Sequence, residues 1–286
     1  MYKPLEISKG AEFMPNVNNE EKSLFFMIKD SFTPRQSISP QVYAVLGAAT
    51  FGLVLILWAL LTYGGLVDSL FMPTPTAAAN AAVKLFTELG YSEDILITII
   101  RVMAGFVIAA VVAVPLGILI GTYTPVEALL EPIMSFIRYL PASAFIPLFI
   151  LWIGVDEPEK IAVIITGSLP QLVLMVAVAT RKVSGDLIEV AYTLGTSKSA
   201  VLWKVILPSS LPAILDAVRM VLGWAWTYVI VAELVGASSG IGYMIIQSQR
   251  MLSTANIFVG ILSIGLIGLA FDYCFKILQR KLFPWS

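Results

Sequence analysis

Only a few side chains of this 286-residue sequence have the types and the spacing that chemistry or solute binding requires. Arg138 stands close to Pro141 and Pro147 in an otherwise apolar stretch. A helix that prolines interrupt exposes free backbone groups, here beside a positive charge. Such a site favours an anion. The alternative is that Arg138 reaches the lipid headgroups or pairs with an acidic side chain.

Other polar side chains stand in apolar stretches further along the chain. Gln171 follows Pro170, and the stretch after residue 220 contains amphipathic rings, a hydroxyl group and a carboxylate. Polar groups at membrane depth must be paired, buried in protein or in contact with a water-filled path. We interpret them as candidates for a solute path, with interhelical hydrogen bonds as the alternative and, for Glu233, simple access to water. The candidates are Arg138, Pro141, Gln171, Trp224, Thr227, Tyr228 and Glu233.

The residues that the sequence lacks exclude several classes of protein. It has no His and one Cys, Cys274, which removes imidazole and thiolate metal sites, a disulfide framework and the usual nucleophile–base pairs. The run GASSGIG at 236–242 has the glycines of a phosphate loop, but no GxxxxGK motif occurs in the chain. We therefore expect no catalytic residue, no metal site and no cofactor bound by this chain.

The composition places these residues in a membrane protein. Hydrophobic residues make up 58% of the chain and charged residues 13%, against about 25% charged in soluble domains. A mean hydropathy of +0.88 leaves too few polar groups to cover a water-exposed surface. A net charge of -1 offers no basic surface for nucleic acid. The predicted fold class is all-α and integral to the membrane.

Long gaps between charged residues predict about six transmembrane helices, because a charge in the hydrocarbon core costs about 2.5 to 3.5 kcal/mol. The third span carries Arg138 inside it, and the fifth contains Asp216, Arg219 and Glu233. The predicted spans cover about 42–62, 102–121, 133–155, 161–180, 211–235 and 251–271.

The positions of Lys and Arg predict the orientation, because cytoplasmic segments carry an excess of both. With the N-terminus inside, twelve basic residues are cytoplasmic and three, Lys84, Lys160 and Arg250, are outside. The connection 123–131 is then an inner loop, although it has two glutamates and no basic residue. Residues 1–41 are predicted to be a cytoplasmic tail without a cleavable signal, in which 24–32 suits an interfacial elbow helix; a disordered tail is the alternative.

The connection 181–212 is far longer than a turn requires, and such connections are usually functional. Apolar residues at helical spacing predict a first helix over 185–194 that ends at Gly195. A second helix follows a serine cap and continues through Trp203 until Pro208 stops it. The pattern predicts a cytoplasmic helical hairpin, with a solvated amphipathic loop as the alternative.

This hairpin resembles the cytoplasmic signature of the permeases of binding-protein-dependent ABC importers. The segment EVAYTLG at 189–195 is followed by KVILP at 204–208, in the order and spacing of that signature, with Val190 in place of its first Ala. The resemblance implies a coupling helix that lies in a groove of a separate ATPase subunit. The residues implied to take part are Glu189, Ala191, Gly195, Leu207 and Pro208.

The resemblance covers about 95–285 and is strongest to the branch that imports nitrate, sulfonates, taurine and bicarbonate. It rests on RYLPASAFIPLFILWIG at 138–154, WTYVIVAELVGASSGIGYMI at 226–245 and IFVGILSIGLIGLAFD at 257–272; Asn256 departs from the acidic residue common there. It implies a type I ABC importer permease fold in the bacterial plasma (inner) membrane. The implied partners are a second copy of the chain, two cytoplasmic ATPase subunits that hold ATP and Mg, and an external solute-binding protein.

The sequence thus favours the permease subunit of an ATP-driven importer for a small anion or oxyanion, formed by residues 42–286 with a coupling region at about 181–210. An ATP-independent secondary carrier or channel is the alternative. An intramembrane enzyme is disfavoured, because the sequence has no convincing nucleophile–base pair and no set of metal ligands. The hairpin distinguishes them, because a lone carrier has no use for a docking helix. Gly117 and Gly121 predict a close helix contact, either within one chain or between two.

Overall fold

A computed structural model describes residues 39–284, and in this range the secondary structure is entirely helical. This confirms the predicted fold class. The chain divides after residue 60 into two units. The expected elbow helix at 24–32, and all but the last residues of the 1–41 tail, lie outside the described residues.

The first unit contains most of α2 (Pro40–Tyr63), a helix of 24 residues without a charged side chain. A helix of this length and composition can cross the hydrocarbon core. It matches the first predicted span.

Four long helices of the second unit match predicted spans. They are α4 (Tyr91–Thr122), α7 (Glu157–Arg181), α10 (Leu207–Gly236) and α12 (Thr254–Leu282). Two shorter helices, α3 (Pro75–Glu88) and α11 (Ile241–Arg250), were not expected from the sequence. Among the described residues, five helices are long and apolar enough to span a membrane, or six if one bent pair counts as a span.

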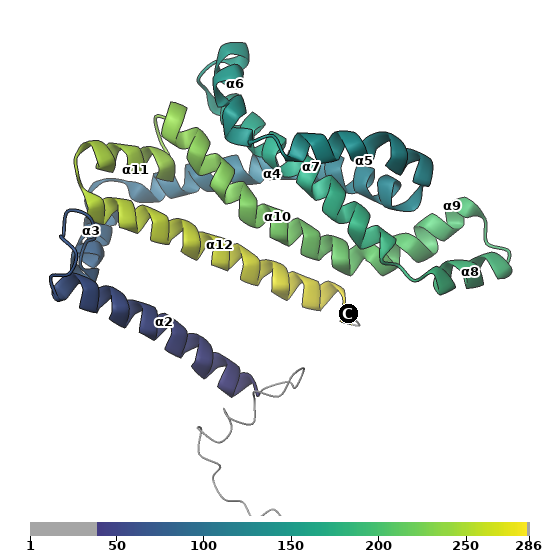
Figure 1. The fold of residues 1–286 in the computed structure, drawn as a ribbon, viewed down its shortest axis with the longest axis horizontal. Coiled ribbons are helices and arrows are strands. Elements are labelled where there is room, and N and C mark those ends of the chain that lie inside the picture. Colours follow the sequence, from purple (N-terminus) through teal and green to yellow (C-terminus); the bar gives the residue numbers. More distant parts are fainter. Residues whose placement is uncertain (1–38, 285–286) are drawn as a thin grey trace, which may run out of the picture. The chain divides into compact units, whose positions relative to one another are not determined.

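The bent pair occupies the third predicted span. Its first part is α5 (Thr124–Arg138). Its second part, 142–153, consists of the short helix η1 (Ala142–Phe145) and α6 (Ile146–Ile153), and it is bent by 81° relative to α5. Figure 1 shows α6 turning away from α5. The break follows Arg138 and contains Pro141, whose missing N–H and fixed φ end the helical ladder. The prediction of a loop at 123–131 was wrong, because α5 already begins at Thr124.

A seam of small residues on α4 lets this helix pack closely against α7. Glycine or alanine recurs at every fourth position, at Gly105, Ala109, Ala113, Gly117 and Gly121. A Cβ at Gly117 would lie 2.6 Å from the backbone oxygen of Val173 in α7. The Gly117–Gly121 pair thus makes an intrachain contact, which decides between the two expectations for this motif.

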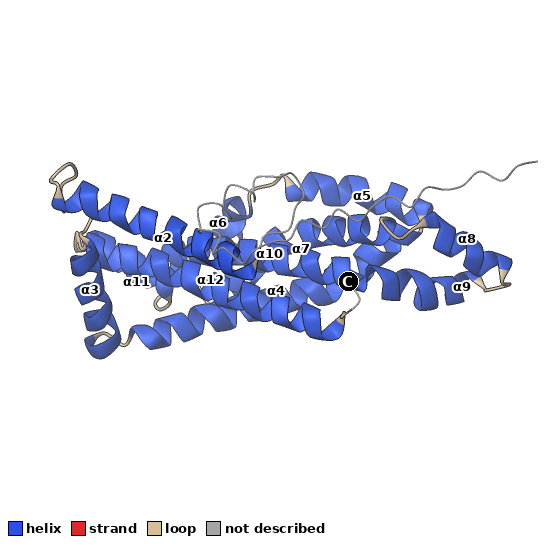
Figure 2. Ribbon diagram, turned by 90° about the horizontal axis from the view of Figure 1, so that it is seen from below, coloured by secondary structure: helices blue, strands red, loops and turns tan. Residues whose placement is uncertain are grey.

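The hairpin consists of α8 (Gly185–Thr193), α9 (Lys198–Val201) and one π-helical turn, η2 (Leu202–Ile206). In Figures 1 and 2 it lies at the opposite end of the second unit from α3 and α11. The expectation that Pro208 stops the second helix was wrong, since the helix is continuous from Lys198 to Gly236. Pro208 lies in the first turn of α10, after a π-helical turn in which the Leu207 N–H donates to the Leu202 carbonyl. The wider turn makes room for a ring that would clash in a regular helix.

Candidate functional site

A cavity of about 320 Å³ lies between α5, α7 and α10 on one side of the helix break. Arg138, from the last turn of α5, and Lys182, just after α7, bring two positive charges to its wall. Gln171 adds an amide and Asp216 a carboxylate. The other lining residues are Leu174, Met175, Val178, Ala179, Ala213, Ala217 and Met220.

The guanidinium of Arg138 has no acidic partner among the described residues. Its carbon lies 4.9 Å from the ring centre of Tyr139, and Nη2 donates to the Tyr139 hydroxyl over 3.1 Å. The side chain is exposed. Since no carboxylate neutralises it within the described chain, Arg138 keeps donors for an anion.

The structure brings only two of the candidate path residues to this cavity, Arg138 and Gln171. Tyr228 instead packs against α7, where a Cβ at Gly167 would lie 2.6 Å from its ring. Thr227 is exposed, but its hydroxyl donates to the Trp224 carbonyl over 2.7 Å. Trp224 and Pro141 are exposed elsewhere on the chain.

Glu233 does not have the access to water that its place near the end of a span suggested. Its side chain has no exposed surface, and its Oε1 lies 2.7 Å from Nη1 of Arg101. The same oxygen accepts from the Thr98 hydroxyl over 2.8 Å, and Oε2 accepts from the Gly242 N–H over 2.8 Å. This carboxylate is buried and paired within the protein, so it is not available to a solute.

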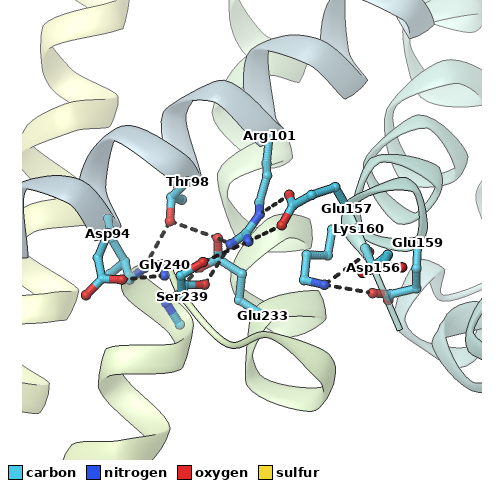
Figure 3. A network of polar contacts seen from close by, with 12 residues as sticks. Asp94, Thr98, Arg101, Asp156, Glu157, Glu159, Lys160, Glu233, Ser239 and Gly240 are labelled. Atoms are coloured by element: carbon cyan, nitrogen blue, oxygen red, sulfur yellow. Dashed lines mark hydrogen bonds and ion pairs between the residues drawn. The ribbon is translucent and has the colours of Figure 1, made fainter. Parts of the chain in front are cut away.

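Arg101 is the centre of this network, which Figure 3 shows. Besides Glu233, the guanidinium binds Glu157 at the start of α7 through two hydrogen bonds of 2.6 and 2.5 Å. It also donates to the Ser239 carbonyl over 2.7 Å. One side chain therefore ties α4 to α7, to α10 and to the loop before α11.

The glycine-rich loop uses its backbone donors on the protein itself. The Gly240 N–H donates to Asp94 over 2.6 Å, and the Ile241 N–H donates to Thr98 over 2.9 Å. Together with the Gly242–Glu233 bond, these contacts satisfy three of the free N–H groups at the start of α11. The loop therefore does not offer these donors to a phosphate group.

The partners of Arg101 could not be found from the sequence. Asp94, Thr98 and Glu157 come from positions that no motif connects. The available signal was the presence of opposite charges, Arg101 and Glu233, in two separate apolar stretches, since such charges must be paired. Among the described residues, no group of three His, Cys, Asp or Glu side chains is arranged to hold a metal ion.

The hairpin forms a small apolar core of its own. Ala191, Val201 and Ile206 are buried in it, so Ala191 lies inside the hairpin. Glu189, Gly195 and Pro208 are exposed, and Leu207 is partly buried. Gly195 adopts φ +78°, which a glycine tolerates and which ends α8 as expected, and the Ser197 hydroxyl caps α9 by accepting from the Ala200 N–H.

Large apolar side chains are exposed on the outer face of the hairpin. Leu194 is 79% exposed and Trp203 is 64% exposed. Three apolar residues of α8 are about half exposed: Leu187, Val190 and Tyr192. The hairpin follows Arg181, the last residue of α7, and the described part of the chain leaves this apolar surface uncovered.

A second set of charges fixes the end of α7 against α5. Arg181 forms ion pairs with both Glu127 and Glu131. These two glutamates belong to the segment expected to be an acidic inner loop. Arg181 thus supplies the positive charge that the segment 123–131 lacks.

Comparisons with known proteins agree on one family. The family described as "Binding-protein-dependent transport system inner membrane component" matches residues 113–285. A putative aliphatic sulfonates transport permease protein of Bacillus subtilis is 36% identical over 236 residues, which are 81% of this chain and 84% of that protein. The taurine transport system permease protein of Escherichia coli is 30% identical over 256 residues, 88% of this chain and 92% of that protein.

A solved structure has the same fold. An inward-facing form of the MetNI methionine ABC transporter contains a chain that superposes with a TM-score of 0.54 at 20% identity. The match covers 65% of this chain and 95% of that chain. At this identity the likeness concerns the fold alone.

Proposed function

This chain belongs to the binding-protein-dependent transport system inner membrane component family, and from this premise we propose that it conducts a small anion or oxyanion across the membrane. It is a transmembrane permease subunit of an ABC importer. The proposed solute is of the nitrate, sulfonate, taurine or bicarbonate class. The names of the sulfonate and taurine relatives support this class.

The observation that carries the proposal is that two basic residues, Arg138 and Lys182, line the same cavity beside the helix break. The only acidic residue that lines the cavity, Asp216, already has two partners: Arg219 Nη2 at 3.3 Å and the Gln279 amide at 3.0 Å. The two cations are therefore not neutralised within the cavity. A planar guanidinium with free donors suits the oxygens of a sulfonate, nitrate or bicarbonate group.

The partners proposed are a second copy of the chain, two cytoplasmic subunits that bind ATP and Mg, and an external solute-binding protein. The exposed apolar face of the hairpin, with Leu194 and Trp203, supports an ATPase contact because a water-exposed apolar surface of this kind favours a protein partner. Glu189, Gly195 and Pro208 lie on the accessible side of the same hairpin. Closure of the ATPase subunits would then move the hairpin and, through the continuous helix from Lys198 to Gly236, the wall of the cavity.

The location proposed is the bacterial plasma (inner) membrane, with both termini in the cytoplasm. The excess of basic residues on one side of the spans supports this orientation. It places the hairpin in the cytoplasm and the network around Arg101 near the outer surface.

The test is uptake by cells that express this chain with its ATPase and binding protein, using labelled taurine, an alkanesulfonate, nitrate and bicarbonate, each at several concentrations. Arg138→Gln is expected to lower the rate of uptake about tenfold, the loss of one charge-assisted hydrogen bond. Arg250→Gln, an exposed arginine at the end of α11, is the matched control. Unchanged transport in Arg138→Gln would remove this residue from the path, and uptake of none of the four solutes would reject the solute class.

A further inference from the structure

A second cavity, of about 510 Å³, lies between α10 and the C-terminal part of α12. It shares Ala213 and Asp216 with the solute cavity, but its basic residues are different, since Arg138 and Lys182 do not line it. Its wall contains basic side chains from α12 above a small apolar surface from α10. The lining residues are Pro212, Ala213, Asp216, Lys276, Gln279 and Arg280.

The acidic groups near this cavity are already paired. Asp216 is bound by Arg219 and Gln279, as described above. Asp272 lies 2.7 Å from the Lys276 ammonium group and 3.5 Å from Arg219 Nη1. The three cations Arg219, Lys276 and Arg280 thus face two carboxylates, which leaves one positive charge in excess.

Arg280 carries that excess charge. Its side chain is exposed, lines the cavity and forms no ion pair among the described residues. A guanidinium with free donors at the mouth of a basic cavity is suited to a phosphate group. The cavity therefore has the charge and the donors for an anionic phosphate ligand.

The surroundings of the cavity favour a phosphate that is attached to a lipid. The same helix carries large exposed apolar residues beside and beyond the basic pair, including Leu269, Tyr273, Ile277 and Leu278. Basic cavities between transmembrane helices at the cytoplasmic side are suited to anionic headgroups, while the adjoining helix surface accepts acyl chains. The basic end of α12 is the cytoplasmic end by its charge.

We propose that this cavity, between α10 and α12, binds the headgroup of an anionic phospholipid through Arg280 and Lys276. The bound headgroup bridges the two helices at the base of α10, close to where α10 continues into the hairpin. The site does not depend on which solute is transported. Its ligand is distinguished from free phosphate by the need for acyl chains.

The experiment uses the purified full-length chain and native mass spectrometry to count retained lipids after exposure to equal amounts of phosphatidylglycerol and phosphatidylcholine. Thermal unfolding, followed by tryptophan fluorescence, is measured with each lipid and with inorganic phosphate. The wild-type chain is expected to retain phosphatidylglycerol in preference and to unfold at a higher temperature with it. Removing one basic side chain near an anionic lipid is expected to weaken binding about fivefold.

Arg280→Gln tests the cavity, and Lys281→Gln is the matched control, because Lys281 is the next residue on the helix and does not line the cavity. Arg280→Lys keeps the charge and is expected to retain most of the binding. The proposal is overturned if Arg280→Gln retains phosphatidylglycerol like the wild type, or if Lys281→Gln loses as much. It is also overturned if the wild type shows no lipid preference, as when a second copy fills the cavity, or if inorganic phosphate stabilises the chain as well as the lipid does.

Discussion

Arg101 and Glu233 are 132 positions apart in the sequence, yet their side chains form a buried ion pair with 2.7 Å between Nη1 and Oε1. Glu157 at the other side of the guanidinium is 58% exposed, so the network extends from the protein interior to its surface. The buried part has the larger energetic consequence. Removing one partner of a buried pair leaves an uncompensated charge, at a cost of about 3–5 kcal/mol.

We expect Arg101→Gln to destabilise the protein by about 3–5 kcal/mol, because Glu233 then loses its charged partner. Thermal unfolding of the detergent-solubilised chain measures this, with Arg250→Gln as the exposed control. The double variant Arg101→Gln with Glu233→Gln should be less destabilised than the sum of the single variants, since no buried carboxylate is left unpaired. Equal unfolding temperatures for Arg101→Gln and the wild type would contradict a stabilising network.

We expect Gly240→Ala to destabilise the protein more than Gly154→Ala. Both glycines have similar backbone angles, φ 110° and ψ 167° at Gly240 and φ 86° and ψ 178° at Gly154, so the backbone strain of about 1–3 kcal/mol is shared. Only at Gly240 would the new Cβ meet Glu233 Oε1 at 2.5 Å. The difference in unfolding temperature between the two variants measures this contact, and identical values would mean that the loop moves aside without cost.

Gly117→Ala should destabilise the contact between α4 and α7. The added Cβ would lie 2.6 Å from the Val173 carbonyl oxygen, which belongs to the backbone of α7 and cannot rotate away. We expect a loss of about 1–3 kcal/mol in unfolding free energy, typical of overpacking. Gly265→Ala on α12, where nothing lies within 4 Å, is the control and should be neutral or slightly stabilising. A neutral Gly117→Ala would show that the two helices separate easily.

Leu194→Ser should uncouple transport from ATP hydrolysis without unfolding the chain. Leu194 is 79% exposed on the hairpin, so its loss removes partner contact and little internal packing. We expect about a tenfold fall in uptake and in the ATPase activity that solute and binding protein stimulate, as for a contact residue at the centre of an interface. Leu66→Ser changes a similarly exposed leucine, at 75%, outside the hairpin and should leave both unchanged.

Glu189→Ala and Gly195→Arg test the same hairpin at the residues that carry the family signature. Both side-chain positions are exposed, so membrane insertion should be intact while coupled transport falls. Membrane fractionation checks insertion, and uptake together with ATPase activity checks coupling. Normal uptake in Gly195→Arg would reject docking through this hairpin.

The regular spans were predictable because crossing a membrane depends on local length and composition. The uncharged stretches before Asp68 and after Lys160 became α2 and α7 almost as expected. The break after Arg138 was anticipated because proline acts on its own helix. The continuation through Pro208 was not, because it depends on a π-helical turn that no single residue specifies.

The sequence by itself determined that this is an all-helical membrane chain with one long, amphipathic hairpin, since both properties follow from the order of apolar and charged residues. Tertiary structure alone decided which charges meet. It paired Arg101 with Glu233 and Glu157, buried Ala191 inside the hairpin, and left Arg138 and Lys182 together in one cavity. The spacing of apolar residues predicts which face of a helix is buried. The distances between charged side chains of different helices depend on how those helices pack, and the sequence of one helix does not determine them.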